Sequence, residues 1–345
     1  MPDPPWPFRA DNWNDRPIDV LCLGHALVDR LAHATLDDVV SARLELGAMT
    51  LVDGERAAEI ERAFSGWHEV AGGSAANTAA GIASLGGSPG FAGAVGDDKA
   101  GSWYASDLQQ LGVAASVTTV SSGLPTGVCH VLVATRGERS MATSLGAASE
   151  LAAETVEQAG VDRARVVYVE GYLLDAPAAA AALDRAMELA EGASTLVALS
   201  LSDPFVVSRH RDRILEMVFG GAVDVLLGNA DEALGLTGAD SVAGAAAALR
   251  RDGSVAVVTL GASGAFVVTP DGEAAVRADE VAHVVDTTGA GDLFAAGFLY
   301  GLTHGAGPEG ALRIGSFAAA EVIGHLGARP AIRLQDAIPE GLFSG

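Results

Sequence analysis

The chain has 345 residues, of which 49% are hydrophobic and 19% charged, a composition typical of a folded protein with one large or two smaller domains. Its 21 basic and 44 acidic side chains give a formal net charge of −23. A field of that sign repels phosphate backbones and anionic lipids, so neither nucleic acid nor a membrane is an expected partner. Cys22 and Cys129 are too few for a disulfide framework and, with no signal or membrane-spanning pattern, predict a reduced, cytoplasmic protein.

Short apolar runs alternate with alanine-rich helical stretches along most of the chain, which is typical of βαβ units and a mostly parallel sheet. Residues 1–16 are predicted to be a terminal tail, and residues 17–340 a single α/β domain. The expected strands are 18–24, 90–95, 166–169, 195–201, 223–227, 255–260 and 265–269, and the expected helices are 77–85, 101–111, 177–191, 230–236, 242–251, 292–302 and 309–325.

Two stretches, 29–53 and 113–144, interrupt this alternation. They contain alternating or β-branched runs, such as residues 49–52 and 128–133, without a strong helix between them. We expect them to pair as a small second sheet that is inserted into the α/β core and lies over the main sheet as a lid.

The strongest chemical signal is the segment 286–292, DTTGAGD, which leads into a predicted helix. Its glycines permit tight backbone geometry, and the unpaired N–H groups at a helix start form an anion site. Such donors stabilise the charge on a transferring phosphoryl group, while Asp292 is placed to accept the proton of an attacking hydroxyl. The alternative is that Asp292 only caps the helix.

A second signal is the segment 71–79, AGGSAANTA, in which a glycine pair opens a helix of small residues. Glycine lets a ligand approach the backbone closely, and Asn77 offers both a donor and an acceptor to hydroxyl groups. Close packing of a helix on a sheet is the alternative explanation. The chain's one lysine, Lys99, precedes Ala100, so neither a Walker A loop nor the strand lysine of protein kinases is available.

Both segments resemble the signature regions of the ribokinase-like (PfkB-type) carbohydrate and nucleoside kinases, in the same order. Three further segments resemble that family: the turn at 96–101, the Asn-x-x-Glu pattern at 229–232 and the Thr-x-Gly-x-x-Gly loop at 259–264. The resemblance spans residues 18–330. It implies a ribokinase-like three-layer α/β/α fold with a Rossmann-like core and a β-sheet lid, and an ATP- and Mg²⁺-dependent phosphotransferase that acts on an alcohol group.

The resemblance also implies roles for single residues. Asp292 would be the catalytic base, and the backbone of Gly289, Ala290 and Gly291 the anion hole. Arg139 would reach the transferred phosphate, with a solvated hairpin charge as the alternative. The remaining implied roles are acceptor binding by His25, Asp29, Gly72, Gly73, Ser74 and Asn77, ATP binding by Asn229, Thr259, Gly261, Gly264 and Thr287, a water-mediated Mg²⁺ contact by Glu232, and, as in some relatives, a monovalent cation such as K⁺ at Asp286 and Thr288.

Within the family, the chain resembles the adenosine kinases. It keeps their Asn-x-x-x-Asp spacing at 25–29, where the Asp29 carboxylate suits two ribose hydroxyls but His25 replaces the usual Asn. The stretches 125–141, 170–174 and 199–205 are also similar to adenosine kinases. We therefore expect conversion of adenosine to AMP. The alternatives are a sugar kinase acting on ribose, fructose or a sugar phosphate, and a non-catalytic nucleoside- or nucleotide-binding regulatory protein; both a monomer and a homodimer are compatible with the sequence.

Overall fold

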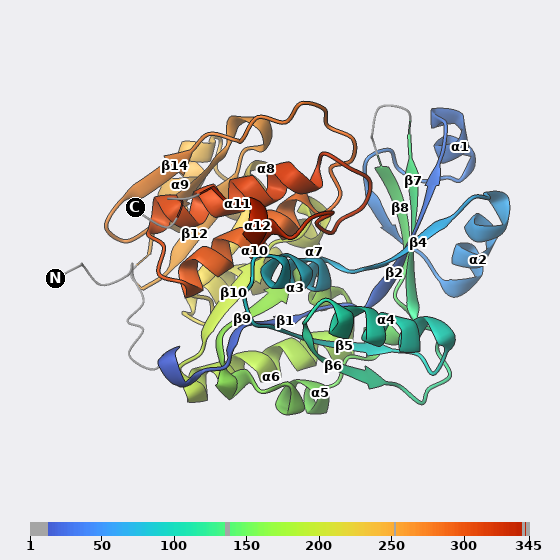
Figure 1. Ribbon diagram of the computed structural model, residues 1–345, viewed down its shortest axis with the longest axis horizontal. Coiled ribbons are helices and arrows are strands. Elements are labelled where there is room, and N and C mark those ends of the chain that lie inside the picture. The colour runs from blue at the N-terminus through green and yellow to red at the C-terminus, as the bar shows by residue number, and fades with distance from the viewer. Residues whose placement is uncertain (1–12, 135–138, 252, 340–341, 343–345) are drawn as a thin grey trace.

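Two sheets of unequal size organise the chain in the computed structural model, which describes residues 13–134, 139–251, 253–339 and 342 (Figure 1). Within these residues the larger sheet has nine strands, in the order β14-β13-β12-β11-β10-β9-β1-β5-β6. Neighbours from β12 to β6 pair in parallel, whereas β13 pairs antiparallel with both β12 and β14. The strands are β1 (Ile18–Leu23), β5 (Pro89–Val95), β6 (Ala114–Thr119), β9 (Ala164–Glu170), β10 (Leu196–Ser200), β11 (Val225–Asn229), β12 (Val255–Thr259), β13 (Ala265–Val268) and β14 (Glu273–Val276).

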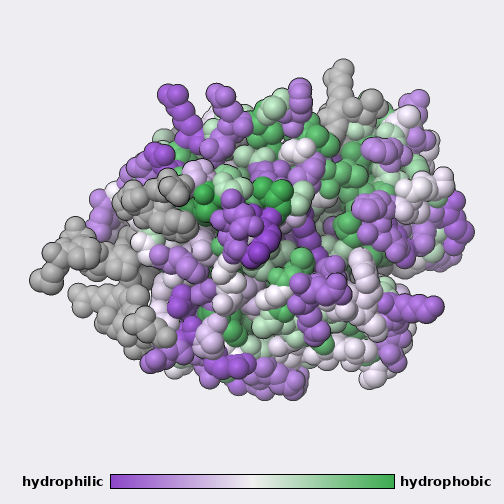
Figure 2. Space-filling view, viewed as in Figure 1, coloured by the Kyte–Doolittle hydropathy of each residue, from purple (hydrophilic) through white to green (hydrophobic). Residues whose placement is uncertain are grey.

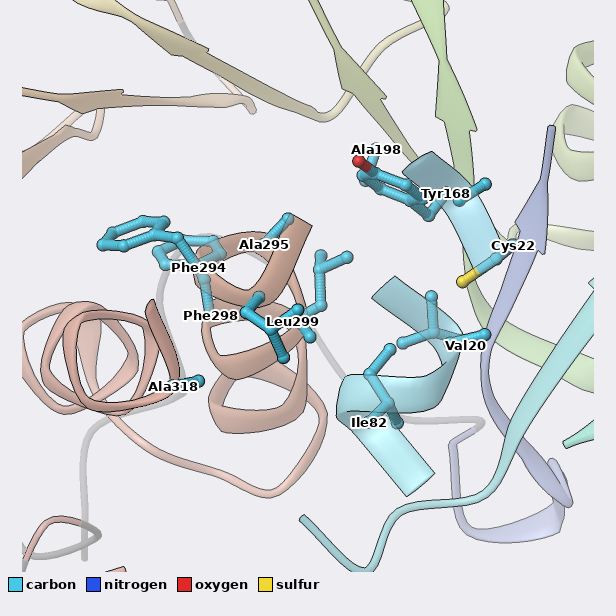
Figure 3. Packing of buried hydrophobic residues seen from close by; sticks show 14 of the residues in the cluster. Val20, Cys22, Ile82, Tyr168, Ala198, Phe294, Ala295, Phe298, Leu299 and Ala318 are labelled. Carbon is cyan, nitrogen blue, oxygen red and sulfur yellow. The ribbon is translucent and has the colours of Figure 1, made fainter. Parts of the chain in front are cut away.

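Helices cover both faces of the larger sheet, because its strands are apolar on both sides. In β1, Val20 and Cys22 belong to one hydrophobic cluster, whereas Leu21 and Leu23 belong to the cluster on the opposite face. Figure 3 shows part of the first cluster, with Ile82 among its side chains. That face carries α3 (Ser74–Ser84), α4 (Lys99–Gln110), α10 (Ala290–Thr303), α11 (Pro308–Val322) and α12 (Leu334–Ala337), and the other carries α5 (Ala153–Ala159), α6 (Pro177–Ala193), α7 (Pro204–Phe219), α8 (Ala230–Thr237) and α9 (Val242–Leu249). The predicted three-layer α/β/α fold is confirmed.

The smaller sheet stands at one end of the molecule, on the right in Figure 1, with two helices on its outer side. In the described part of the chain its order is β3-β8-β7-β2-β4. Val39, Ile60 and Leu132 are buried in a separate small core beneath those helices. The elements are β2 (Leu27–His33), β3 (Met49–Leu51), β4 (His68–Gly72), β7 (Gly127–Val133), β8 (Arg139–Ser144), α1 (Leu36–Ser41) and α2 (Gly54–Ala63).

The boundaries of the smaller sheet differ from those predicted for the lid. The expected segment 113–144 includes β6, which instead pairs with β5 in the larger sheet. A β-branched run does not reveal which sheet it joins, and the crossover through α4 returns the chain beside β5. Conversely, α2 and β4 extend the share of the chain in the smaller region to Gly72, past the expected limit at residue 53.

Most predicted elements of the larger unit lie where expected, with ends shifted by a few residues. The helix α7 was not predicted. His210 within it has a non-helical backbone conformation (φ −119°, ψ 19°), so the helix is kinked there and is not one continuous helix. The predicted tail falls largely on residues 1–12, outside the described residues. The Arg16 guanidinium at its end donates to the Ala164 backbone oxygen at 2.6 Å. Short 3-10 helices are η1 (Trp13–Asp15), η2 (Gly146–Glu150), η3 (Val161–Arg163), η4 (Gly171–Asp175) and η5 (Gly261–Ser263).

Polar residues are spread over much of the face seen in Figure 2, with apolar residues interspersed between them. In the part of the chain that the structure describes, no helix is both long and apolar enough to cross a bilayer.

Candidate active site

A cavity of about 420 Å³ is lined by residues of both sheets. Its lining from the larger sheet comes from the carboxyl ends of β1, β9, β10, β11 and β12 and from the loops that follow them. Ligands in open α/β sheets bind at this edge. The smaller sheet contributes Asp29 and a group of apolar side chains, namely Leu27, Met49, Leu51, Val131 and Met141.

Asp292 lies in the first turn of α10 and faces the start of α3. Ser74 Oγ donates to Asp292 Oδ1 at 2.7 Å, and Asn77 Nδ2 donates to Oδ2 at 3.0 Å. Thr78 Oγ1 donates to the backbone oxygen of Asp292 at 3.2 Å, which joins the two helix starts. Burial raises the pKa of Asp292, and the hydrogen bonds from Asn77 and Ser74 oppose that rise. The two glycine-rich motifs of the sequence therefore meet at one carboxylate.

The glycine loop before α10 has the geometry of an anion site. Gly289 is the N-cap residue, with φ +75°, and makes no side-chain capping bond. A Cβ at Gly289 would lie 2.6 Å from the Ala328 backbone oxygen, so this position requires glycine. A Cβ at Gly291 would meet no atom within 4 Å, which leaves the first turn open to a ligand. Because the Asp292 carboxylate pairs with Ser74 and Asn77, its role is not that of a helix cap.

Arg139, at the start of β8, connects the smaller sheet to this loop. Its Nη2 donates to Thr287 Oγ1 at 3.1 Å, and its Nε lies 3.0 Å from Asp286 Oδ1. Asp286 is fully buried and also accepts from the backbone N–H groups of Thr288 (2.8 Å) and Gly327 (2.9 Å). Arg139 is therefore paired beside the anion site, not a solvated hairpin charge. Both oxygens of Asp286 already have partners, so a K⁺ site at Asp286 and Thr288 stays a prediction.

Asp29 is held in the cavity wall by the glycine pair at the end of β4, Gly72 and Gly73. A Cβ at Gly72 would lie 2.1 Å from Asp29 Oδ2. Gly73 has φ +91°, and a Cβ there would lie 2.3 Å from the His25 backbone oxygen. Burial raises the pKa of Asp29 to about 7, against the opposing charge of Arg329. Close backbone approach thus brings Asp29, His25 and the start of α3 together.

Asn229 and Glu232 form a capping box at the start of α8. Asn229 Oδ1 accepts from the Glu232 N–H at 2.9 Å, and Glu232 Oε2 accepts from the Asn229 N–H at 2.9 Å. Glu232 is 4% exposed, and burial raises its pKa to about 7. In the described residues, no group of three or more His, Cys, Asp or Glu side chains is placed to hold a metal ion. Mg²⁺ at this position would therefore bind mainly phosphate oxygens and water, which suits its preference.

A second cavity, of about 430 Å³, shares Asn229 and Thr259 with the first and is also lined by Gly261. Because the two cavities share these residues, together they extend from the glycine loop to the end of β12. Gly264 is different. It has φ +103°, and a Cβ there would lie 2.0 Å from the Val276 backbone oxygen, so glycine is required by the turn into β13.

Several lining residues carry no role in the sequence prediction. Glu170 is buried and accepts from the backbone N–H groups of His25 and Ala75, each at 2.8 Å. The available signal was an acidic residue directly after the apolar run 166–169, at the carboxyl end of a predicted strand. The other unassigned polar residues in the lining are Thr143, Tyr172, Asp175, Ser200, Ser202 and Asp203.

Known proteins resemble this chain over most of its length. Residues 46–334 match the family described as pfkB family carbohydrate kinase. The 5-dehydro-2-deoxygluconokinase of Shouchella clausii is 28% identical over 315 residues, which cover 89% of this chain and 90% of that protein.

Two solved structures are similar in fold as well as in sequence. The adenosine kinase from Sinorhizobium meliloti is 40% identical, with a TM-score of 0.90, and the match covers 93% of this chain and 98% of that chain. A probable sugar kinase from Rhizobium etli is 37% identical, with the same TM-score and the same coverage. These similarities confirm the predicted ribokinase-like fold.

Proposed function

Because the chain belongs to the pfkB family of carbohydrate kinases, which are phosphotransferases acting on hydroxyl groups of sugars or nucleosides, we propose that its acceptor is a nucleoside. The reaction we propose is transfer of the γ-phosphoryl group of ATP to the 5′-hydroxyl of adenosine, which gives AMP and ADP. The observation that most supports transfer to a hydroxyl group is the Asp292 carboxylate, held by Ser74 and Asn77 beside an open glycine loop and within the cavity that Asp29 also lines.

Asp292 is the proposed general base. Its raised pKa brings it nearer to neutrality, where a carboxylate is a better proton acceptor for a hydroxyl group. It takes the proton of the 5′-hydroxyl while the oxygen attacks the γ-phosphorus in line, and the bond to the bridging oxygen of ADP breaks. The proton then leaves Asp292 to solvent.

The charge on the transferring group is stabilised by the first turn of α10 and by Arg139. The N–H groups of Gly289, Ala290 and Gly291 lie at a helix start. That of Ala290 donates to the Thr287 backbone oxygen at 3.3 Å, a long hydrogen bond that a phosphoryl oxygen would replace. Arg139 Nη2 lies 3.1 Å from Thr287 Oγ1, which belongs to the glycine loop before α10. Asn229 would contact ATP and Glu232 would hold Mg²⁺ through water, and the bound Mg²⁺ would supply neutralisation of phosphate charge.

Two features favour a nucleoside over a simple sugar. The apolar side chains that the smaller sheet places in the cavity suit the face of a base, whereas a sugar presents hydroxyls in most directions. The adenosine kinase from Sinorhizobium meliloti is also 40% identical over nearly the whole chain. Asp29 would then accept hydrogen bonds from the two ribose hydroxyls.

A sugar kinase is the second candidate, and one observation favours it. The 5-dehydro-2-deoxygluconokinase of Shouchella clausii is similar over 89% of this chain. The Asp292 and Asp29 geometry would serve a sugar or sugar acid equally well, because both also present primary and vicinal hydroxyls.

The test is an acceptor panel with Mg-ATP, in which ADP release is measured with adenosine, inosine, guanosine, cytidine, ribose, fructose and 5-dehydro-2-deoxygluconate. The proposal predicts the highest kcat/KM for adenosine. A higher value for a sugar or sugar acid would contradict the nucleoside assignment and leave the family unchanged. Binding of nucleoside without any ADP release would identify a non-catalytic binding protein.

A further inference from the structure

The ring of His25 has one nitrogen without a partner at the wall of the cavity. His25 lies in the turn between β1 and β2, is 2% exposed and lines the cavity. Its backbone N–H donates to Glu170 Oε1 at 2.8 Å, and its Nδ1 lies 3.4 Å from the same oxygen. Nε2 is buried and has no hydrogen-bond partner in the described residues. An unpaired buried polar atom is costly, so its partner is expected to come from a bound molecule.

Glu170 determines which nitrogen of the ring carries the proton. Its carboxylate also accepts from the Ala75 N–H at 2.8 Å. Burial raises the pKa of Glu170 to about 7, and the two backbone hydrogen bonds oppose that rise, so the carboxylate is charged at about pH 8. A carboxylate oxygen beside Nδ1 repels a lone pair there and favours the Nδ1–H tautomer. Burial lowers the pKa of His25 to about 4, so the ring is neutral near pH 7. Nε2 therefore presents a lone pair and accepts a hydrogen bond.

The other charged group near His25 is an acceptor as well. Asp175 exerts the main charge effect on the pKa of His25 and lines the same cavity. Its carboxylate is fixed by Arg209 Nη2 at 2.6 Å and by His210 Nε2 at 2.8 Å. The Asp175 carboxylate is already paired and is itself an acceptor, so it cannot satisfy His25 Nε2, and the group that pairs with Nε2 has to donate.

We propose that His25 determines acceptor specificity, with its Nε2 accepting a hydrogen bond from a hydroxyl or amino group of the acceptor molecule. Glu170 is a positioning residue, because it fixes both the ring tautomer and the backbone of the turn. The inference rests on the proposed function, since it concerns the acceptor of the same reaction. The cavity then discriminates against molecules with a carbonyl oxygen or a bare carbon at the contacted position, because either would leave Nε2 unpaired.

The test compares kcat/KM for adenosine with that for inosine, 2′-deoxyadenosine and 3′-deoxyadenosine, each of which lacks one donor. Wild-type protein is expected to discriminate by about 10- to 100-fold against the analogue that lacks the donor to His25, in addition to any loss at Asp29 that the two deoxynucleosides share. His25→Phe keeps a ring but removes the acceptor, and should lower the ratio for that one analogue by about 10-fold while the ratios for the others stay unchanged. His25→Gln, which places a polar atom at a similar reach, should restore a large part of the ratio.

A structural role alone predicts a different pattern. If His25 only supports the turn, His25→Phe lowers kcat/KM for all acceptors by the same factor and leaves every ratio unchanged, which would overturn the inference. Equal use of all four nucleosides by wild-type protein would overturn it as well. If a sugar is the working acceptor, the proposed nucleoside function fails first, and the same ratios are measured with its deoxy and oxo analogues.

The tautomer can be tested without any catalysis. Burial raises the pKa of Glu170 to about 7, so the measurement belongs at about pH 8, where its carboxylate is charged. In ¹⁵N-histidine-labelled protein, the signals of His25, identified by their loss in His25→Gln, should show a protonated Nδ1 and an unprotonated Nε2. A protonated Nε2 would overturn the inference, whatever the acceptor is.

Discussion

At the glycine-loop end of the cavity the functional side chains come from two short segments, residues 74–78 and 286–292, whereas at the opposite end they come from strands spread over residues 25–144. The first end is built on two helix starts that share the Asp292 carboxylate. The second is formed by the smaller sheet, whose lining is mostly apolar with Asp29, Arg139 and Thr143 as its polar residues, and by His25 in the turn before β2. We infer that the helix starts set the rate of transfer and that the smaller sheet sets the choice of acceptor.

The largest effect on activity is expected at the glycine-loop end of the cavity. Asp292→Asn removes the proton acceptor and keeps the size of the side chain, and we expect kcat to fall by about 10³- to 10⁴-fold. Binding of ATP, measured by calorimetry, should change little. Asp212→Asn, at an exposed position of α7, is the matched control. Retention of more than a tenth of the wild-type kcat by Asp292→Asn would show that Asp292 is not the base.

Arg139 joins the two ends, so its removal should affect both rate and stability. We expect Arg139→Ala to lower kcat by about 10²-fold, because a charge-stabilising donor next to the glycine loop is lost. The melting temperature should also fall, because the buried Asp286 carboxylate loses its cationic partner. Arg313→Ala removes an exposed ion pair on α11 and should change neither quantity noticeably. An unchanged kcat for Arg139→Ala would restrict this residue to a structural role.

A change at Gly72 should act on acceptor binding and not on the chemical step. The Cβ of Gly72→Ala would lie 2.1 Å from Asp29 Oδ2, so the carboxylate has to move. We expect KM for the acceptor to rise by about 10-fold, the cost of weakening a hydrogen bond to a charged group, while KM for ATP stays constant. Gly54→Ala, in the same region but with no atom within 4 Å of its Cβ, is the control. Equal effects on both KM values would contradict the division between the two ends.

The smallest effect concerns stability and its dependence on pH. Burial raises the pKa of Asp29 to about 7, above the ordinary value for a carboxyl group, so the folded protein holds this proton more tightly than the unfolded chain does. Stability contributed by that proton is present at low pH and is lost as pH rises from about 4 to 7. Asp29→Asn should therefore raise the melting temperature by a few degrees at about pH 8 and little at about pH 4, while weakening acceptor binding. A lower melting temperature at about pH 8 would contradict this explanation.

The first end of the cavity could be read from the sequence, because each motif is local. A glycine-rich turn followed by a helix defines an anion site from neighbouring residues alone, and the structure places Asp292 at that site. The chain order of strands and helices was equally accessible, since short apolar runs such as β1 and the alanine-rich helical stretches between them are local patterns.

The end of the cavity that the smaller sheet forms could not be predicted from local sequence patterns. Which sheet β6 joins depends on the path of the chain through α4, and the apolar lining from β3, β7 and β8 depends on pairings between distant segments. Glu170 accepts hydrogen bonds from the backbones of His25 and Ala75, which lie 145 and 95 positions away from it in the sequence. No local pattern encodes such contacts.

The most direct measurement compares adenosine with 5′-deoxyadenosine, which differ only in the hydroxyl that is proposed to attack. With Mg-ATP, adenosine should give ADP and AMP in equal amounts, whereas 5′-deoxyadenosine should inhibit this reaction competitively and release no ADP. If neither nucleoside stimulates ADP release nor inhibits it, while a sugar or sugar acid is phosphorylated, the cavity does not accept nucleosides and the proposed function is wrong.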